Sequence, residues 1–388
     1  MENVSSRCGK SDNAPRLRFP EFSGEWVEKK LGEIFFEVNE RKHPELPVLS
    51  IQQGIGTVFR DISERRIAYD KANINAYKVI EPGDFIIHLR SFEGGLECSK
   101  HKGISSPAYK ILRSNCIDSA AFKDYFRSYN FIEGKLAAAV TGIRDGKNID
   151  MPTFWSLKIN IPSLPEQKKI AAFFTLLDRR IQKQRQLVEC LKTYKRGVLQ
   201  SVFSKNYKWE ELSIEDIFSC IIDKNHPDKT VLTIVQGTGT LPRNSIDRKI
   251  SYNAESVSSY KKVKENDFIL HLRSFEGGLE IANEEGIVSP AYTILRATKN
   301  ISPLFYYNYF RSYNFINEKL RIAVEGIRDG KSINMNTFWK IKVPFPPYEL
   351  QNYYASFFSL IDKNIKKNES LLQALEKGKR QLLQKMFI

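Results

Sequence analysis

The sequence predicts an α+β protein with two similar domains separated by two long antiparallel helices, which form a coiled-coil spacer with pseudo-two-fold symmetry. Three observations lead to this prediction: a long internal repeat, short β-type runs within each copy, and a heptad pattern at the end of each copy. The chain has 388 residues. This length fits two domains of ordinary size with connecting elements.

The repeat is strongest in the middle of each copy. Residues 85–113 read FIIHLRSFEGGLECSKHKGISSPAYKILR, and residues 268–296 read FILHLRSFEGGLEIANEEGIVSPAYTILR. Two further motifs return at nearly the same shift: YFRSYNFI at 125–132 and 309–316, and GIRDGK at 142–147 and 326–331. A repeat this long indicates a duplicated domain, because solenoid units are about 20–50 residues long.

Each copy begins with a mixture of short elements. Residues 1–15 are expected to be a flexible tail, residues 16–165 the first domain and residues 205–348 the second. Short runs of β-forming residues broken by Gly, Pro and Asn predict an irregular sheet, with helical pieces notably over Ala120–Ile132. The runs in the first copy are PVLSI (47–51), DFIIHL (84–89), AYKIL (108–112) and LKINIP (157–162).

A long helix is predicted at the end of each copy, over residues 166–204 and 349–388. Pro165 followed by Glu166 is a favourable helix start. Apolar residues alternate spacings of four and three, which is a heptad seam. A helix of about 38 residues is about 57 Å long, and its seam needs a partner. The seam positions are Ile170, Phe174, Leu177, Ile181, Gln184, Val188, Leu191, Lys195, Val198 and Val202, and in the second copy Tyr354, Phe358, Ile361, Ile365, Asn368, Leu372, Leu375, Lys379, Leu382 and Met386.

Two amides interrupt the seams at equivalent positions near the helix midpoints, Gln184 and Asn368. If the helices pack antiparallel and centred, these amides meet and fix the register at some cost in stability. The alternative is that both face solvent at an imperfect seam.

The composition favours a polyanionic partner. The formal net charge is +15 with 60 Lys and Arg against 45 Asp and Glu, which suits nucleic acid first and an anionic membrane surface second. Five scattered cysteines without CxxC spacing argue against a disulfide framework or a zinc site, and they favour a reducing cytoplasm. No apolar run approaches the ~20 residues of a membrane span, and the N-terminus lacks a signal peptide's apolar region.

Motifs of catalysis are weak. FPPY at 345–348 has the form of a methyltransferase motif, but Phe345 cannot accept a hydrogen bond from an amine, so we interpret it as a helix start. The GxG pairs lack the strand–helix context of a cofactor site, and neither a GxxxxGK[ST] loop nor an HExxH pair occurs. The sequence therefore predicts no catalytic residue, no metal site and no cofactor bound by this chain.

The repeated HLRSFEGGLE is the best candidate for DNA contact. Arg can donate to guanine, Glu can accept from cytosine, and Ser can bond either. The GIRDGK basic residues suit phosphate contact, and Arg127 and Arg311 could act likewise. The alternative is a buried Arg–Glu pair that holds a loop. The predicted DNA-binding residues are Gln53, Thr57, Arg60, His88, Arg90, Ser91, Glu93, Arg144 and Lys147 in the first copy, and Gln236, Thr240, Arg243, His271, Arg273, Ser274, Glu276, Arg328 and Lys331 in the second.

These residues resemble a known family. PRLRFPEFSGEWVEKKLGEI (15–34) and INIPSLPEQKKIAAFFTLLDRRI (159–181) resemble the specificity subunit of type I restriction-modification systems. KWEELSIEDI (208–217) and VPFPPYELQNYYASFFSLIDKNI (343–365) match in the second copy. The resemblance covers nearly the whole chain, although the second helix start reads ELQ in place of PEQ.

The resemblance implies two target-recognition domains on an antiparallel helical spacer. It implies a non-catalytic subunit that binds double-stranded DNA and places two methylation subunits, which translocating restriction subunits join. S-adenosylmethionine, ATP and Mg²⁺ are then implied for the partner subunits. The alternatives are a specificity subunit of a modification-only or phage-defence system, a protein-interaction scaffold built on the helical hairpin, and an enzyme such as a lone nuclease.

The likeness of the copies predicts the form of the target. HLRSFEGGLE is identical in both, and pseudo-two-fold symmetry maps onto an inverted repeat in DNA. We therefore expect a bipartite, imperfectly palindromic target with a few unread base pairs between its halves. The alternative is that HLRSFEGGLE is a shared scaffold and bases are read elsewhere.

Overall fold

The computed structural model describes residues 13–60, 71–88, 94–142, 148–204, 209–245, 254–271, 278–326 and 332–387. It divides into two compact units, one of residues 1–184 with 371–388 and one of residues 185–370. Both long helices cross the boundary between these units. Each unit therefore contains part of both long helices, and the predicted domain limits, 16–165 and 205–348, stay a prediction.

The first unit is built on a four-stranded antiparallel sheet in the order β2-β9-β6-β7. Two-stranded pairs β1-β12, β3-β4, β5-β8 and β10-β11 surround it. The strands are β1 (Val27–Lys30), β2 (Phe36–Val38), β3 (Leu49–Gln52), β4 (Gly56–Phe59), β5 (Lys78–Ile80), β6 (Phe85–His88), β7 (Glu97–Cys98), β8 (Gly103–Ser105), β9 (Tyr109–Arg113), β10 (Val140–Thr141), β11 (Asn148–Ile149) and β12 (Lys158–Ile161). The short helices are α1 (Leu31–Ile34), η2 (Lys71–Ala76), α2 (Ser119–Phe122), α3 (Tyr129–Ile132), η3 (Leu136–Ala139) and α4 (Met151–Ser156).

The second unit repeats this scheme with the sheet β14-β21-β18-β19. Its strands are β13 (Glu211–Ser213), β14 (Phe218–Ile221), β15 (Leu232–Val235), β16 (Gly239–Pro242), β17 (Lys261–Val263), β18 (Phe268–His271), β19 (Glu280–Ile281), β20 (Gly286–Val288), β21 (Tyr292–Ala297), β22 (Val324–Glu325), β23 (Ser332–Ile333) and β24 (Lys342–Pro344). Its short helices are α6 (Ile214–Ile217), η5 (Arg243–Ser245), η6 (Ala254–Ser259), α7 (Pro303–Phe310), η7 (Asn314–Lys319), η8 (Leu320–Ala323) and α8 (Met335–Trp339). The predicted mixture of short strands and helices is confirmed.

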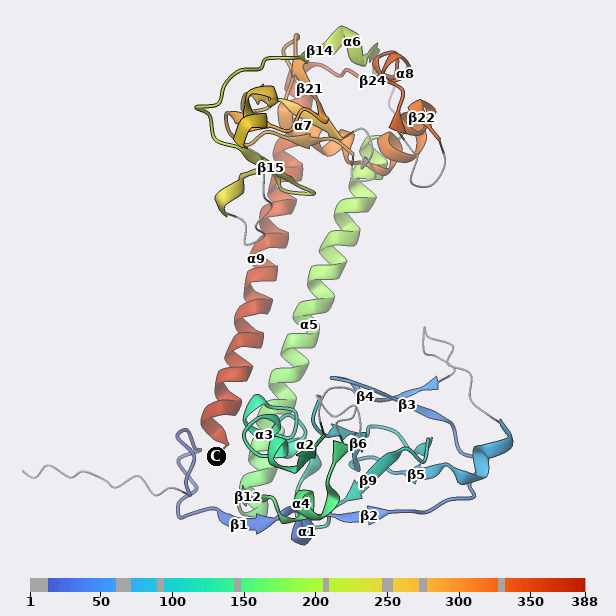
Figure 1. Ribbon diagram of the computed structural model, residues 1–388, viewed down its shortest axis with the longest axis vertical. Coiled ribbons are helices and arrows are strands. Elements are labelled where there is room, and N and C mark those ends of the chain that lie inside the picture. Colours follow the sequence, from blue (N-terminus) through green and yellow to red (C-terminus); the bar gives the residue numbers. More distant parts are fainter. Residues whose placement is uncertain are drawn as a thin grey trace, which may run out of the picture. The chain divides into compact units, whose positions relative to one another are not determined.

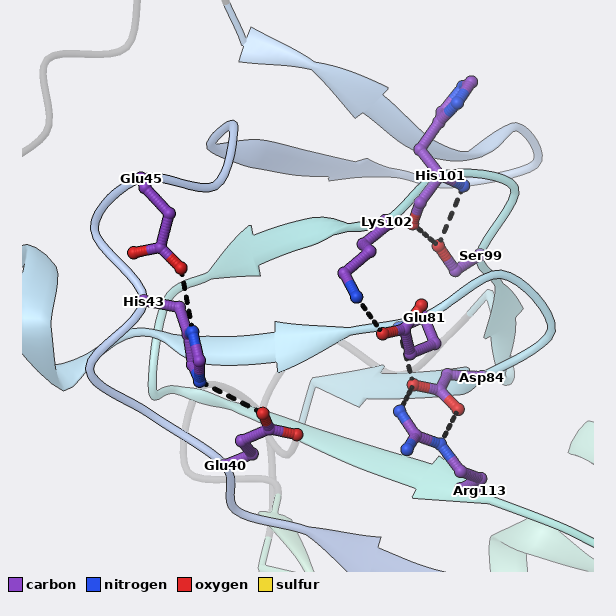
Figure 2. A network of polar contacts seen from close by, with 9 residues as sticks. All are labelled: Glu40, His43, Glu45, Glu81, Asp84, Ser99, His101, Lys102 and Arg113. Carbon is purple, nitrogen blue, oxygen red and sulfur yellow. Dashed lines mark hydrogen bonds and ion pairs between the residues drawn. The ribbon is translucent and has the colours of Figure 1, made fainter.

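The same ion pair links two neighbouring strands of the four-stranded sheet in each unit. The Arg113 guanidinium at the end of β9 donates two hydrogen bonds, at 2.7 and 2.8 Å, to Asp84, which precedes β6 (Figure 2). Asp84 is 2% exposed. Arg296 and Asp267 make the same bidentate contact in the second unit, at 2.8 and 2.6 Å. A bidentate Arg–carboxylate pair fixes geometry as well as contributing energy, so it holds neighbouring strands in register.

The helix at the end of each copy has 39 residues: α5 (Leu164–Val202) and α9 (Tyr348–Met386), drawn green and red in Figure 1. Neither carries an 18-residue window apolar enough to cross a bilayer, and the same holds for every other helix of the described residues. In the second unit Lys192 pairs with Glu369 and Lys195 with Asp362. The residue number rises from 192 to 195 along α5 while that of the partner falls from 369 to 362 along α9. The helix segments within this unit are therefore antiparallel.

An aromatic core anchors the helix ends to the sheet of each unit. Phe387, just after α9, stacks on Tyr125 at 5.0 Å and contacts Trp26 at 5.9 Å. Phe203, just after α5, contacts Phe305 and Tyr309 in the second unit at 5.4 and 5.1 Å. The seam of each helix therefore continues into the core of a domain.

The helical pieces expected over Ala120–Ile132 are confirmed. Two separate turns of helix, α2 and α3, occupy that range. Ser128 has an extended backbone, and its hydroxyl accepts a hydrogen bond from the Phe131 amide. Ser at this position caps a new helix, so it ends one helical piece and begins the next.

Candidate nucleic-acid interface

The turn between β3 and β4 is held by a buried carboxylate. The Gly54 amide donates to Glu97 Oε1 at 2.7 Å, and Glu97 is 5% exposed. Gly54 has φ +83°, a conformation that glycine adopts without strain. In the second unit the Gly237 amide donates to Glu280 at 2.8 Å. Each turn presents an exposed glutamine, Gln53 or Gln236.

The Gly-Gly pair of HLRSFEGGLE lies against this turn. A Cβ on Gly94 would lie 2.7 Å from the Gln53 side chain. A Cβ on Gly95 would lie 2.1 Å from the Phe126 carbonyl oxygen, and Gly95 also has φ +75°. Only glycine therefore fits at Gly95. This close approach places the Gln53 turn and Arg127 next to each other.

Arg127 and Arg311 stand over the same glutamates. Arg127 Nε lies 3.6 Å from Glu97 Oε1, and Arg311 Nε lies 3.6 Å from Glu280 Oε1. In the second unit the Tyr307 hydroxyl accepts a 2.8 Å hydrogen bond from Arg311 and donates to Glu280 at 3.4 Å. Burial raises the pKa of Tyr307 to about 12, so its hydroxyl stays protonated and can donate.

A histidine at the end of the central strand packs against a tyrosine in each unit. His88 ends β6, and its ring contacts Tyr109 edge-on at 5.2 Å; His271 and Tyr292 repeat this at 5.2 Å. In the second unit a cleft of about 290 Å³ is lined by Ile234, Gln236, Ile269, His271, Gly278, Glu280 and Tyr292. Gln236 and His271 thus line the same cleft, and DNA contact by either residue stays a prediction.

A lysine supports each histidine–tyrosine pair; Lys78 is buried and Lys261 is half-buried. The Lys78 ammonium donates to the Tyr109 carbonyl oxygen at 2.9 Å, and Lys261 donates to the Tyr292 carbonyl oxygen at 2.6 Å. Burial lowers the pKa of both lysines, although a nearby glutamate, Glu37, opposes this for Lys78. These lysines are structural cations beneath the candidate surface.

Thr57 and Thr240 are corrections to the predicted set. They are 1% and 0% exposed. The Thr57 hydroxyl is bonded to Ser99 at 3.0 Å and accepts from the Lys100 amide at 3.1 Å, and the Thr240 hydroxyl accepts from the Asn283 amide at 2.9 Å. These hydroxyls are enclosed and already hydrogen-bonded. They link β4 to residues 99–100 and β16 to Asn283, and they do not face a ligand. Figure 2 shows Ser99 bonded in turn to His101.

Arg60 and Arg243 are half-buried on the same hairpins. Arg60 Nε donates to the Ser50 hydroxyl at 3.1 Å, and Arg243 Nε donates to Thr233 at 3.3 Å. Each guanidinium therefore braces a hairpin, and DNA contact by the remaining donors stays a prediction. The other predicted contacts lie outside the described residues: Arg90, Ser91, Glu93, Arg144, Lys147, Arg273, Ser274, Glu276, Arg328 and Lys331.

The predicted register amides differ in environment. Gln184 is 5% exposed, whereas Asn368 is half-buried and donates to the Asn364 carbonyl and side-chain oxygens at 2.9 Å. They belong to different units, so their pairing stays a prediction. The polar seam residues Lys195 and Lys379 form ion pairs with Asp362 and Asp178, at 2.7 and 2.6 Å.

The sequence reasoning missed three of these residues: Glu97, Glu280 and Tyr307. A signal for the glutamates was present, since they end the identical HLRSFEGGLE blocks and follow the turn glycine by the same 43 positions in both copies. Among the described residues no group of three His, Cys, Asp or Glu side chains could hold a metal ion. The arrangement offers amide and guanidinium donors beside a carboxylate, which are the groups that read base edges.

Several known proteins resemble this chain in sequence or in fold. The family described as type I restriction modification DNA specificity domain matches residues 116–190. The chain is similar in sequence to type I specificity subunits. The type I restriction enzyme MjaVIII specificity subunit of Methanocaldococcus jannaschii is 22% identical over 95% of this chain and 92% of its own length. A protein of the same organism, provisionally named as the MjaX specificity subunit, is 24% identical over 58% of this chain, which spans little more than half (57%) of that relative.

Two solved structures have the same fold along almost the whole chain. A chain from a study of type I R-M complex assembly and conformational transition gives a TM-score of 0.59 at 16% identity, with 93% of this chain and 97% of that chain covered. The S subunit of the type I restriction-modification system from M. genitalium gives 0.53 at 13% identity, with 97% and 99% covered. At this identity the match concerns the fold.

Proposed function

We propose that this chain is a sequence-specific DNA-binding specificity subunit of a type I restriction-modification complex, with no catalytic site of its own. The observation that supports this most is the recurrence of one polar arrangement in two units of a chain with net charge +15. In each unit a turn glutamine, a buried glutamate and an arginine lie together. The full-length similarity to specificity subunits gives the arrangement its role.

The proposed partners are double-stranded DNA, two methylation subunits and restriction subunits. S-adenosylmethionine, ATP and Mg²⁺ belong to those partners in this proposal. The two 39-residue helices serve as an antiparallel spacer between the recognition domains, which are residues 16–165 and 205–348, and relate them by a pseudo-two-fold axis. The target is then bipartite and imperfectly palindromic.

The direct test is sequencing of adenine methylation in cells with and without this chain. We expect one bipartite motif to lose methylation when the chain is removed. Binding by the purified chain should also weaken linearly in log salt, because each neutralised phosphate releases counterions. An unchanged methylation pattern together with salt-insensitive binding would favour a protein scaffold, and DNA cleavage by the purified chain alone would favour an enzyme.

A further inference from the structure

Glu97 is a buried carboxylate whose charge is only partly balanced by its surroundings. Its Oε1 accepts from the Gly54 amide and faces Arg127 at 3.6 Å. Its Oε2 is buried without a hydrogen-bond partner among the residues that the structure describes. An unsatisfied buried oxygen is costly. The same carboxylate stands in the second copy as Glu280, where it accepts a hydrogen bond from the Gly237 amide at 2.8 Å.

The arginine above the glutamate lies directly on the turn. A Cβ added to Gly54 would meet Arg127 Nη2 at 3.2 Å, and one added to Gly237 would meet Arg311 Nη2 at 3.0 Å. The Arg127 and Arg311 side chains are 29% and 28% exposed. Each guanidinium therefore lies over the turn with its Nε facing the glutamate at 3.6 Å, an ion-pair distance without a hydrogen bond. Each arginine side chain is also partly open to solvent beside an exposed glutamine.

We propose that Arg127 and Arg311 each read a guanine edge in one half of the DNA target, and that Glu97 and Glu280 are positioning residues that aim them. This rests on the proposed DNA-recognition function and adds the residues and the base. Two parallel donors of a fixed guanidinium match the O6 and N7 acceptors of guanine. A phosphate contact would require only charge, whereas the ion pair with a buried carboxylate also favours one orientation of the guanidinium.

The two copies differ in how firmly they hold this arginine. Tyr307 accepts from Arg311 Nη1 at 2.8 Å, and its ring lies 4.9 Å from the guanidinium carbon. The equivalent residue in the first copy is Lys123, whose ammonium pairs with Asp178 at 2.6 Å. Among the described residues, Arg311 is thus oriented by a hydrogen bond to Tyr307 and an ion pair with Glu280, whereas Arg127 has the ion pair with Glu97. The second domain is therefore expected to discriminate its guanine more strictly.

The test is selection of randomised duplex DNA by the full-length chain, co-expressed with its methylation subunit. Arg127→Ala should lower discrimination at one guanine of one half-site about 5- to 150-fold and leave the other half-site unchanged. Arg311→Ala is the matched variant and should relax the other half only. Glu97→Gln retains an acceptor for the Gly54 amide, and it should relax the same guanine as Arg127→Ala to a smaller extent.

Tyr307→Phe removes the hydroxyl but keeps the ring, so it should bring discrimination in the second half-site down toward that of the first. Thermal unfolding of every variant distinguishes a loss of stability from a loss of base discrimination. If Arg127→Ala lowers the melting temperature but keeps the motif, the arginine is structural and the inference is wrong. If it weakens all sequences equally, the contact is to phosphate and the inference is again wrong. Failure of the unaltered complex to select any motif would overturn the proposed function itself.

Discussion

An ion pair between Arg18 and Glu166 fastens the N-terminal part of the described chain to the start of α5. Arg18 donates two hydrogen bonds to the Glu166 carboxylate, at 2.8 and 2.7 Å. The Trp26 indole nitrogen also approaches it at 3.4 Å. Glu166 is 1% exposed, and the Arg18 side chain is 16% exposed. The second copy carries Leu350 at the position equivalent to Glu166, so it has no such pair.

We predict that Glu166→Leu destabilises the first unit by about 2 kcal/mol. Removing one partner of a fully buried pair costs about 3–5 kcal/mol, because the other charge stays buried. Arg18 can turn toward water, which reduces this penalty. The leucine side chain also contributes burial of about 1.5–3 kcal/mol if it packs fully, although the site is shaped for a carboxylate. The balance of these terms is a moderate loss.

The double variant Arg18→Met with Glu166→Leu should recover most of the loss, since apolar residues of similar volume often replace a buried pair without cost. The measurements are chemical denaturation and hydrogen exchange at the Leu17 amide, which donates to the Lys385 carbonyl oxygen at 2.9 Å. Glu21→Gln is the control, because the Lys169–Glu21 pair is exposed to solvent and its loss should leave stability almost unchanged. A Glu166→Leu protein as stable as the unaltered chain, or a double variant no better than the single one, would refute the reasoning.

Three further outcomes follow from buried groups. Thr57→Ala should cost about 1–3 kcal/mol of unfolding free energy, from loss of its buried hydrogen bonds, yet leave the methylated motif intact; a changed motif would restore Thr57 as a reading residue. Burial raises the pKa of the Cys98 thiol to about 11, so mass spectrometry should show alkylation near pH 8 at exposed Cys220 well before Cys98, and equal rates would contradict that burial. Burial alone would raise the pKa of Asp178, but Lys123 and Lys379 hold it below its usual value. Its stabilisation is then present above about pH 4 and is lost as pH falls through the lower folded pKa; Asp178→Asn should remove this acid dependence in denaturation curves, and an identical pH profile would argue against it.

Local pattern was sufficient to predict the long helices. The heptad spacing depends on burial along one face, and the seam residues Ile170, Phe174 and Val188 are buried as that spacing requires. The β runs likewise became β3, β6, β9 and β12 within a few residues. The apolar spacing of a helix or strand can be read from a short segment, so these elements could be predicted without knowledge of their tertiary contacts.

Contacts between distant residues were not predictable from local pattern. The helix break at Ser128 depends on a serine capping a new helix, and serine is compatible with several local structures. The burial of Thr57 depends on Ser99, which lies 42 positions away. The Gly54–Glu97 hydrogen bond spans 43 positions. Thr57 was predicted to contact DNA because its chemistry suits such a contact, and only the packing shows that it is enclosed.

The packing also separates two parts of the identical HLRSFEGGLE blocks, one with a structural role and one for which DNA contact is predicted. Gly95 has no room for a Cβ, Leu96 is fully buried, and Glu97 anchors the turn. Identity at these positions follows from the fold, so it says nothing about which bases the two domains select. Arg90, Ser91 and Glu93 lie outside the described residues, and DNA contact by these three residues stays a prediction. The proposal of a palindromic target therefore depends on those three positions and on the Arg127–Arg311 pair, and the Lys123–Tyr307 difference is where the half-sites are expected to become unequal.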